Sequence, residues 1–142
     1  MQFRAKDYDE AVHERWMALT LPQPEADYLC KPVIQRVDGE WVACQRTVVM
    51  DCDTNYRGDV LICSRPGRES EVHPTGVTCG LVELYDVQPH DLPGCWEWKF
   101  RDPRRVISFP AKTPRGKAGG LWRYVCPKGE VTPYPRYVKL GE

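Results

Sequence analysis

Apolar and polar residues alternate strictly over Trp96–Arg101, which predicts a β-strand with its aromatic side chains on one face. Other short runs are rich in β-branched and aromatic residues and are separated by turn-forming residues. The predicted strands are Met17–Leu21, Trp41–Val49, Asp59–Ser64, Val77–Val87, Trp96–Phe100, Arg104–Phe109 and Leu121–Cys126. This pattern is typical of a small β-barrel rather than an α/β sheet, so we predict a mainly β fold with short helices (α+β).

A helical periodicity precedes the strands. Apolar residues recur at nearly helical spacing at Tyr8, Val12, Trp16 and Leu19. The segment Asp7–Glu10 resembles a capping box, in which Asp7 accepts from first-turn amides and Glu10 reaches back. We therefore predict a helix from Tyr8 to Trp16, within an N-terminal helical extension (residues 1–16) that covers an opening or edge of the barrel.

The length and composition predict one domain. The chain has 142 residues, of which 42% are hydrophobic, and we assign residues 1–142 to a single core. Gln23–Leu29 should form a short helix or turn between the first two barrel strands, and residues 127–142 a C-terminal tail with a final strand around Tyr137. Because there is no apolar run of membrane-spanning length and no leader-like segment, we expect a cytoplasmic protein without membrane association.

The seven cysteines show no metal-binding pattern. They include no Cys-x-x-Cys and have no His neighbour at zinc-ligand spacing. Cys63 and Cys79 lie in apolar, strand-like runs, where a reduced thiol behaves as a small buried hydrophobic residue. Dinucleotide-binding and phosphate-binding loop motifs are also missing. The sequence therefore predicts no metal and no cofactor.

Charge is balanced overall but unevenly distributed. The formal net charge is zero, which argues against a protein that coats nucleic acid by bulk electrostatics. However, the segment from Lys99 to Arg123 contains eight basic residues and one acid. This segment either forms a basic patch that binds a few phosphates, or its basic residues are the ordinary solvated faces of antiparallel strands.

Several sequence blocks follow one another in the order found in a known family. Gln23–Ala26 stands where that family carries a Gln-Pro-Trp-Ala turn, and Tyr56–Ser64 matches its Arg-Gly strand. Gly80–Val87 is similar to its fourth strand, Arg101–Val106 to its Asn/Asp-Pro-Arg turn, and Arg115–Trp122 to its closing Gly-Leu-Trp strand. The chain thus resembles the ASCH domains, a branch of the PUA-like β-barrels. The resemblance covers most of the chain and implies a small PUA-like (ASCH) barrel that works on nucleic acid.

The departures from this family bear on chemistry. Aligning Gly39–Arg46 on the family's Gly-x-Lys-x-x-Glu-x-Arg block puts Trp41 at the lysine and Cys44 at the glutamate. Members that hydrolyse the amide of acetylated cytidine are thought to use that lysine. An indole N–H is only a donor and cannot serve as base or nucleophile. The same hydrolysis is not expected here, unless Lys31 takes the place of the missing lysine.

The resemblance implies a cleft between the barrel and the Gln23–Leu29 segment that receives a base. There Trp41 would stack on the base, a contact of about 1–3 kcal/mol, and Gln23 would bind its Watson–Crick edge. Otherwise Trp41 packs in the core and Gln23 is an inert surface residue. Arg46 and Arg57 would hold phosphate or base edges. The remaining candidate contacts are Ser64, Arg65, Arg68, Arg115 and Lys117. The loop that follows Ser64 and carries Arg65 and Arg68 could equally be a connection without a partner. The segment Arg115–Lys117 could equally serve only to form a tight turn.

We predict a nucleic-acid-binding module that recognises RNA, or a single-stranded or flipped base that can carry a modification. Its partner would be RNA or single-stranded DNA, and its oligomeric state is left open. The alternative is a hydrolase on the same fold, either an amidohydrolase acting on acylated cytidine or another nucleoside, or a ribonuclease. That enzyme would need Lys31, Glu25 or Cys44 as general base. A third alternative is an adaptor that contacts another protein.

Overall fold

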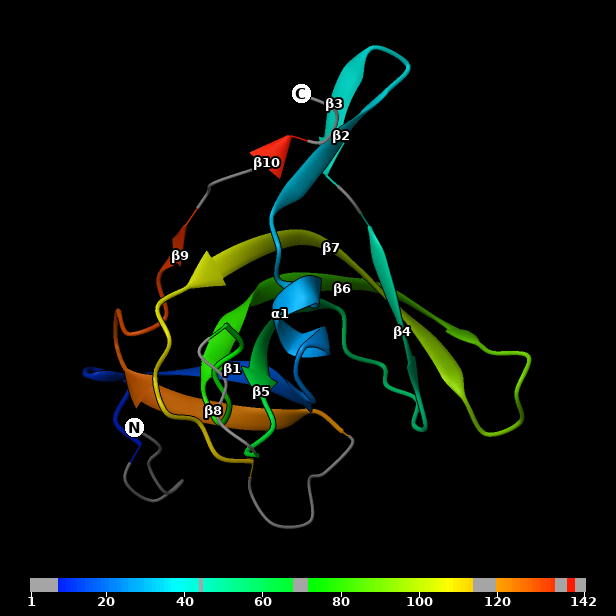
Figure 1. The fold of residues 1–142 in the computed structure, drawn as a ribbon. Coiled ribbons are helices and arrows are strands. Elements are labelled where there is room, and N and C mark those ends of the chain that lie inside the picture. Colours follow the sequence, from blue (N-terminus) through cyan, green and yellow to red (C-terminus); the bar gives the residue numbers. More distant parts are fainter. Residues whose placement is uncertain (1–7, 44, 68–71, 114–119, 135–137, 140–142) are drawn as a thin grey trace.

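The fold of the chain is mainly β. The computed structural model describes residues 8–43, 45–67, 72–113, 120–134 and 138–139 (Figure 1). The elements are β1 (His13–Leu21), α1 (Glu25–Leu29), β2 (Val33–Val37), β3 (Glu40–Ala43), β4 (Arg46–Met50), β5 (Gly58–Ser64), β6 (Thr78–Pro89), β7 (Trp96–Val106), β8 (Trp122–Pro127), β9 (Pro133–Tyr134) and β10 (Val138–Lys139). The predicted mainly β class is confirmed, and so is a short helix within Gln23–Leu29.

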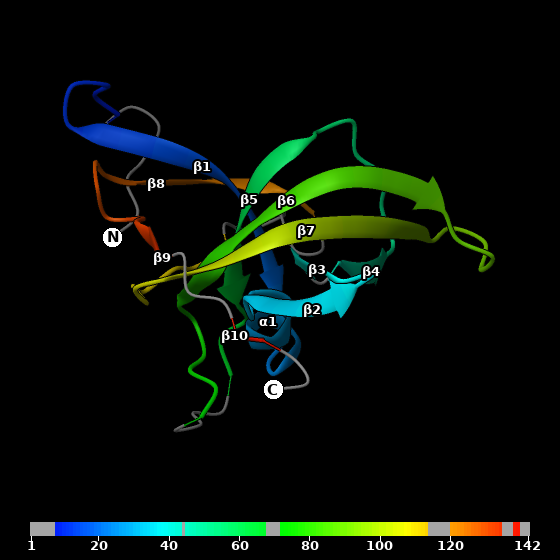
Figure 2. The ribbon, with the colours of Figure 1, turned by 90° about the horizontal axis from the view of Figure 1, so that it is seen from above.

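The main sheet has the strand order β4-β7-β6-β5-β1-β8, with β9 paired to β7. β1 runs parallel to β5, with Ala18 opposite Leu61, and antiparallel to β8, with Met17 opposite Arg123. The sheet curves strongly in both ribbon views (Figure 1, Figure 2). Its outer strands β4 and β8 do not pair with each other, so the described strands form an open sheet rather than a closed barrel.

Two hydrophobic clusters lie on the two faces of the main sheet. One joins strand residues to α1 and contains Leu19, Val60, Ile62, Trp98 and Phe100 together with Ala26 and Leu29 of the helix. The other contains Ala18, Leu61, Leu81, Trp122 and Tyr124. Adjacent residues of one strand fall into different clusters because successive side chains point to opposite faces. The prediction that Trp96, Trp98 and Phe100 share one face is confirmed, because Trp98 and Phe100 belong to the first cluster and Trp96 packs against it.

The end of α1 packs directly on β6 at Gly80. A Cβ atom at position 80 would lie 2.5 Å from the carbonyl oxygen of Arg104 and 2.7 Å from Cβ of Cys30. Cys30 is the C-cap of α1 and is fully buried. Only glycine leaves room for this approach of helix to strand. Gly80 therefore sets the position of α1 on the sheet.

A second, small sheet has the order β10-β2-β3 and stands apart from the main sheet (Figure 1). In it β2 and β3 are antiparallel, with Arg36 opposite Trp41. The strand β2 was not predicted, and the predicted strand Trp41–Val49 is wrong as one unit because β3 and β4 belong to different sheets. Tyr137 lies outside the described residues, and β10 begins at Val138.

The predicted helix from Tyr8 to Trp16 is wrong for the residues that the structure describes. A turn follows Asp9, whose side-chain Oδ1 accepts from Ala11 N (3.0 Å) and whose carbonyl accepts from His13 N (2.7 Å). β1 then begins at His13, and Trp16 pairs with Tyr124 of β8. Hydrogen bonding of this segment to β8 outweighs a weak local periodicity. Residues 1–7 of the predicted extension lie outside the described chain.

The strands predicted at Trp96–Phe100 and Arg104–Phe109 form one continuous strand, β7, that ends at Val106. Between the pairs Leu81–Arg104 and Glu83–Arg101, β7 contains one more residue than β6. Asp102 in this bulge has a φ of +54°. The Asp-Pro-Arg sequence that predicted a turn therefore forms a β-bulge, which bends the strand without ending it.

Candidate functional site

A groove of about 460 Å³ lies where α1 meets the main sheet. Its walls come from the end of β1, the first turn of α1, the outer strand β4, and Arg65, which follows β5. The lining residues are Thr20, Leu21, Pro22, Glu25, Val48, Val49, Met50, Asp51, Arg65 and Cys95. Two residues of the predicted sites, Glu25 and Arg65, are thus brought to one hollow from different elements.

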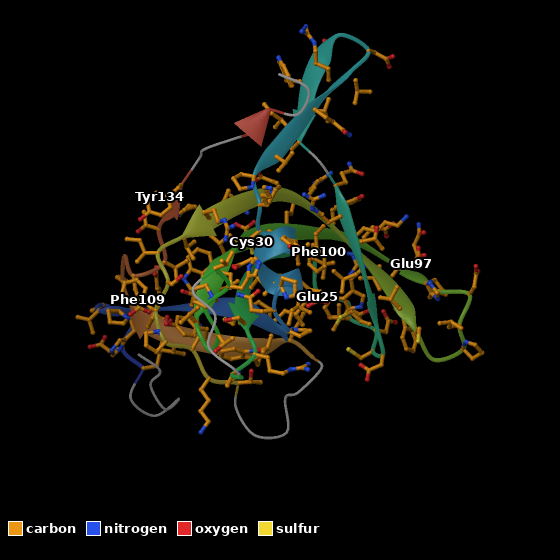
Figure 3. All side chains as sticks on the ribbon, viewed as in Figure 1. Glu25, Cys30, Glu97, Phe100, Phe109 and Tyr134 are labelled. Atoms are coloured by element: carbon orange, nitrogen blue, oxygen red, sulfur yellow. The ribbon has the colours of Figure 1, made fainter. Side chains whose placement is uncertain are left out.

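Backbone hydrogen bonds hold the walls of the groove. The amide of Arg65 donates to the carbonyl of Leu21 (2.8 Å), which ties the chain after β5 to the end of β1. The amide of Ala26 donates to the carbonyl of Pro22 (3.0 Å), and this hydrogen bond holds the start of α1. Glu25 follows Pro24 at the start of the helix (Figure 3). Hydrogen bonds therefore fix the backbone at Glu25 and at Arg65.

The groove combines apolar walls with a few charged groups. Leu21, Pro22, Val48 and Met50 supply apolar surface, whereas the charged lining residues are Glu25, Asp51 and Arg65. Carboxylates accept hydrogen bonds from an amine or a ring N–H, and a guanidinium donates to a carbonyl or phosphate oxygen. An apolar hollow of this size with a few polar groups is the common form of a small-ligand site. The arrangement suits a planar, polar heterocycle.

A buried polar cluster lies on α1 beside this groove. Oδ2 of Asp27 is 2.8 Å from Nδ1 of His73, and Oδ1 accepts from Nη1 of Arg105 (3.3 Å). The Asp27 residue is only 7% exposed. Burial would raise the pKa of Asp27, but hydrogen bonds from His73 and Gln23 and the charge of Arg105 lower it below its ordinary value. The carboxylate therefore stays ionised and ties the helix to β7 and to the loop at His73.

Gln23 and Ser64 are both engaged within the protein. Nε2 of Gln23 donates to the carbonyl of Pro74 (2.7 Å), and its Oε1 accepts from the amide of Asp27 (3.1 Å). Ser64 is fully buried, and its Oγ accepts from the amide of Val77 (3.1 Å). Neither residue lines the groove. In this structure both side chains organise the loops around α1.

Trp41, Arg46 and Arg57 are not brought together. Trp41 lies on β3 in the small sheet, where the guanidinium of Arg36 sits 5.3 Å from its ring centre. Arg46 begins β4, and its Nε is buried without a hydrogen-bond acceptor. Arg57 precedes β5 and donates to the carbonyls of Thr54 (3.0 Å) and Tyr56 (2.8 Å), at the opposite end of that strand from Ser64.

The other predicted residues contribute little to the groove as it is described. Lys31 is exposed just after α1 and does not line it. Arg68, Arg115, Lys117 and Cys44 lie outside the described residues. Of the three candidate bases, only Glu25 is therefore placed at the groove.

Three of the arginines between Lys99 and Arg123 form ion pairs with acids from other elements of the fold. Arg101 pairs with Glu83 (2.8 Å), Arg104 with Asp59 (2.6 Å), and Arg105 with Asp27 (3.3 Å). These carboxylates belong to β6, β5 and α1, so they are distant from the arginines in the sequence but close to them in space. A run of basic residues in the sequence is thus not the same as a basic surface.

The described cysteines behave as packing residues. Cys30, Cys63, Cys79 and Cys126 are buried, as expected for thiols within apolar strands. Burial raises the pKa of Cys79 to about 12, so this thiol stays protonated and is a poor nucleophile. Within the described part of the chain, no group of three or more His, Cys, Asp or Glu side chains could hold a metal ion.

Two parts of this region have no local signal in the sequence analysis above. Asp27 and His73 are 46 residues apart and share no spacing pattern. Asp51 directly follows β4, and its neighbour Met50 was left outside the predicted strand. The alternation of Val48 and Met50 could have extended that strand and marked Asp51 as the residue at its end.

Comparisons with known proteins and a search for membrane spans add no further assignment. Among the described residues, no helix is both long enough and apolar enough to cross a membrane. No protein-family model matches the chain. No curated protein matches it significantly either.

Proposed function

We propose that this protein is a nucleic-acid-binding module that receives one unpaired or flipped base in the groove between α1 and β4. The supporting observation is that this groove lies beside the Gln23–Leu29 segment, where the ASCH resemblance implies a base-binding cleft. We further propose that the fold is PUA-like, with the curved main sheet as an open form of the barrel. The partner is RNA or single-stranded DNA in the cytoplasm.

The chemistry of the groove supports a single base rather than a long stretch of backbone. Its volume of about 460 Å³ lies in the range of small-ligand sites. Leu21 and Met50 contact the faces of the heterocycle, and Glu25 accepts from its exocyclic amine. Arg65 donates to a base carbonyl or to the adjoining phosphate. With two acids and one arginine among its lining residues, the groove does not attract polyanions by charge alone.

Filling the groove tests this proposal. Val49 lines the groove and is 49% exposed, so Val49→Trp can be accommodated without disturbing the core. We expect the affinity for labelled single-stranded RNA or DNA, measured by fluorescence anisotropy in a salt series, to fall at least tenfold. The matched control is Ile107→Trp, which changes a residue of similar exposure (50%) that does not line the groove. Equal affinities for both variants and the unsubstituted protein would contradict the proposal.

The alternative function is hydrolysis of an acylated nucleoside or of RNA in the same groove. The observation that favours it is the position of Glu25, a candidate general base, among the lining residues. Product formation from acetylated cytidine or RNA, abolished by Glu25→Gln, would support the enzyme. Binding without turnover would support the binding module alone.

A further inference from the structure

A second hollow lies at the other end of β1 from the groove. It has a volume of about 220 Å³ and is lined by Arg15, Trp16, Met17, Tyr56 and Arg123. Arg15 and Met17 are near the start of β1, whereas the groove residues Thr20 and Leu21 are at its end. The two hollows therefore share a strand but no lining residue. We call this second hollow the arginine pocket.

The two arginines come from neighbouring strands and belong to one face. In the antiparallel pairing of β1 with β8, Arg15 is opposite Val125 and Met17 is opposite Arg123. Residues opposite each other, and residues two apart in a strand, share a face, so Arg15 and Arg123 are diagonal neighbours. Diagonal side chains of this length can reach a common ligand.

These arginines differ from the paired ones elsewhere in the sheet. Both are exposed, and neither forms an ion pair with any described acid, in contrast to Arg101, Arg104 and Arg105. The acid nearest in sequence, Glu14, contacts the thiol of Cys126 instead (3.7 Å). Two neighbouring guanidinium groups without a carboxylate repel each other, and an anion between them removes that repulsion.

The rest of the pocket wall is aromatic and fixed in place. The guanidinium of Arg15 lies 4.8 Å from the ring centre of Tyr8, which orients it. The hydroxyl of Tyr56 donates to the carbonyl of Asp59 (2.6 Å), so the Tyr56 ring is anchored. Nε1 of Trp16 is buried and has no acceptor. Because Trp16 alternates with Arg15 and Met17 along β1, its indole packs against the hydrophobic cluster on the opposite face, and the polar donors of the pocket are the two guanidinium groups.

We propose that the arginine pocket is a phosphate-binding site, in which Arg15 and Arg123 together hold the phosphate of a free nucleotide or of a nucleic-acid backbone. Guanidinium groups bind phosphate oxygens in pairs of parallel hydrogen bonds, and two of them satisfy several oxygens at once. The arginine pocket is larger than several water molecules together. It therefore has room for the phosphate and for part of the attached sugar. The site is independent of the base-binding groove.

The indole N–H of Trp16 reports indirectly on this site, because Trp16 lies between the lining residues Arg15 and Met17 in β1. In proton–nitrogen correlation spectra, its signal is assigned by its loss in Trp16→Phe. We expect a saturable shift of this signal when adenosine 5′-monophosphate or a short oligouridylate is added, and none with adenosine. The double variant Arg15→Gln/Arg123→Gln should weaken this binding at least tenfold. Arg101→Gln, which removes an exposed arginine already paired with Glu83, should leave it unchanged.

The two phosphate sources give different results. A free nucleotide site saturates with the monophosphate and responds weakly to the oligouridylate. A backbone site binds the oligouridylate, and the double variant lowers the salt dependence of its affinity by about 0.7 in the log–log slope, the value for one phosphate contact to a single strand. Three results would overturn the proposal: no saturable shift with either probe, equal binding of adenosine, or unchanged affinity in a double variant whose spectrum shows an intact fold.

Discussion

The α1 junction and the small sheet differ in how firmly their residues are held. At the α1 junction, formed by Asp27, Cys30, His73, Gly80 and Arg105, a half-buried ion pair and a glycine contact fix the helix against the sheet. In the small sheet, β3 alternates between exposed and half-buried residues, and its aromatic residue Trp41 lies against Arg36 at the surface. The groove shares the helix α1 with the first region, through its lining residue Glu25, and has no lining residue in the small sheet.

The residues of the α1 junction hold the fold together, whereas those of the small sheet lie at the surface. Substitutions at the α1 junction should disturb stability and, through the position of Glu25, the groove. Substitutions in the small sheet should do little to either. Three variants test the contrast, from the largest expected effect to the smallest.

Gly80→Ala should have the largest effect. The added methyl group would overlap the backbone of Arg104 and the side chain of Cys30, so the end of α1 must move away from β6. We expect a loss of about 3 kcal/mol in the free energy of unfolding, the upper part of the usual range for an overpacked site. Urea denaturation measures it. The control is Gly67→Ala, where nothing lies within 4 Å of the added atom. A loss below that of the control would show that α1 is not held at Gly80.

Asp27→Asn should lower the free energy of unfolding by about 2 kcal/mol at pH 7, because His73 and Arg105 lose a charged acceptor. The pKa of Asp27 is lower in the folded protein than its ordinary value of 3.8. The stability that the Asp27 carboxylate contributes is therefore fully present above its ordinary pKa. It is lost as the pH falls through the pKa of the folded protein. Unfolding of the two proteins at pH 7 and pH 3 should show the difference shrinking in acid. Asp91→Asn, at an exposed position, is the control, and a difference that stays constant with pH would contradict the assignment.

Trp41→Ala should have the smallest effect. It removes the cation–π contact with Arg36, which is worth about 0.5–1 kcal/mol at an exposed site. Because Trp41 does not line the groove, we expect the affinity for single-stranded RNA to stay within twofold of the unsubstituted protein. Val42→Ala, on the same strand, is the matched control. A tenfold loss of affinity confined to Trp41→Ala would restore the predicted stacking role of this indole.

The strands could be predicted where side-chain alternation and turn residues agree. Asp59–Ser64 and Val77–Val87 correspond closely to β5 and β6, because their apolar residues pack on the buried faces of the main sheet. The helix at Tyr8–Trp16 was wrong because the pairing of β1 with β8 depends on residues more than a hundred positions away. The turn at Asp102 was wrong because a bulge and a turn favour the same residue types.

The candidate site was predicted in location better than in composition. The segment around Gln23–Leu29 does adjoin a groove, and Glu25 and Arg65 line it. The sequence could not show that Gln23 and Ser64 would be used internally, since their partners, Pro74 and Val77, are 51 and 13 residues away in the chain. It also could not show that the register of β1 and β8 would make diagonal neighbours of Arg15 and Arg123.

The place of β1 between β5 and β8 has a consequence for biosynthesis. β1 is translated about a hundred residues before its antiparallel partner β8, which ends at Pro127, so a nascent chain must be translated as far as β8 before β1 is paired on both sides. Pairing between strands so far apart in the sequence slows folding. Until β8 is made, the free edge of β1 can associate with other chains. A ribosome-bound chain stalled before Trp122 should therefore need a chaperone more than the finished protein does.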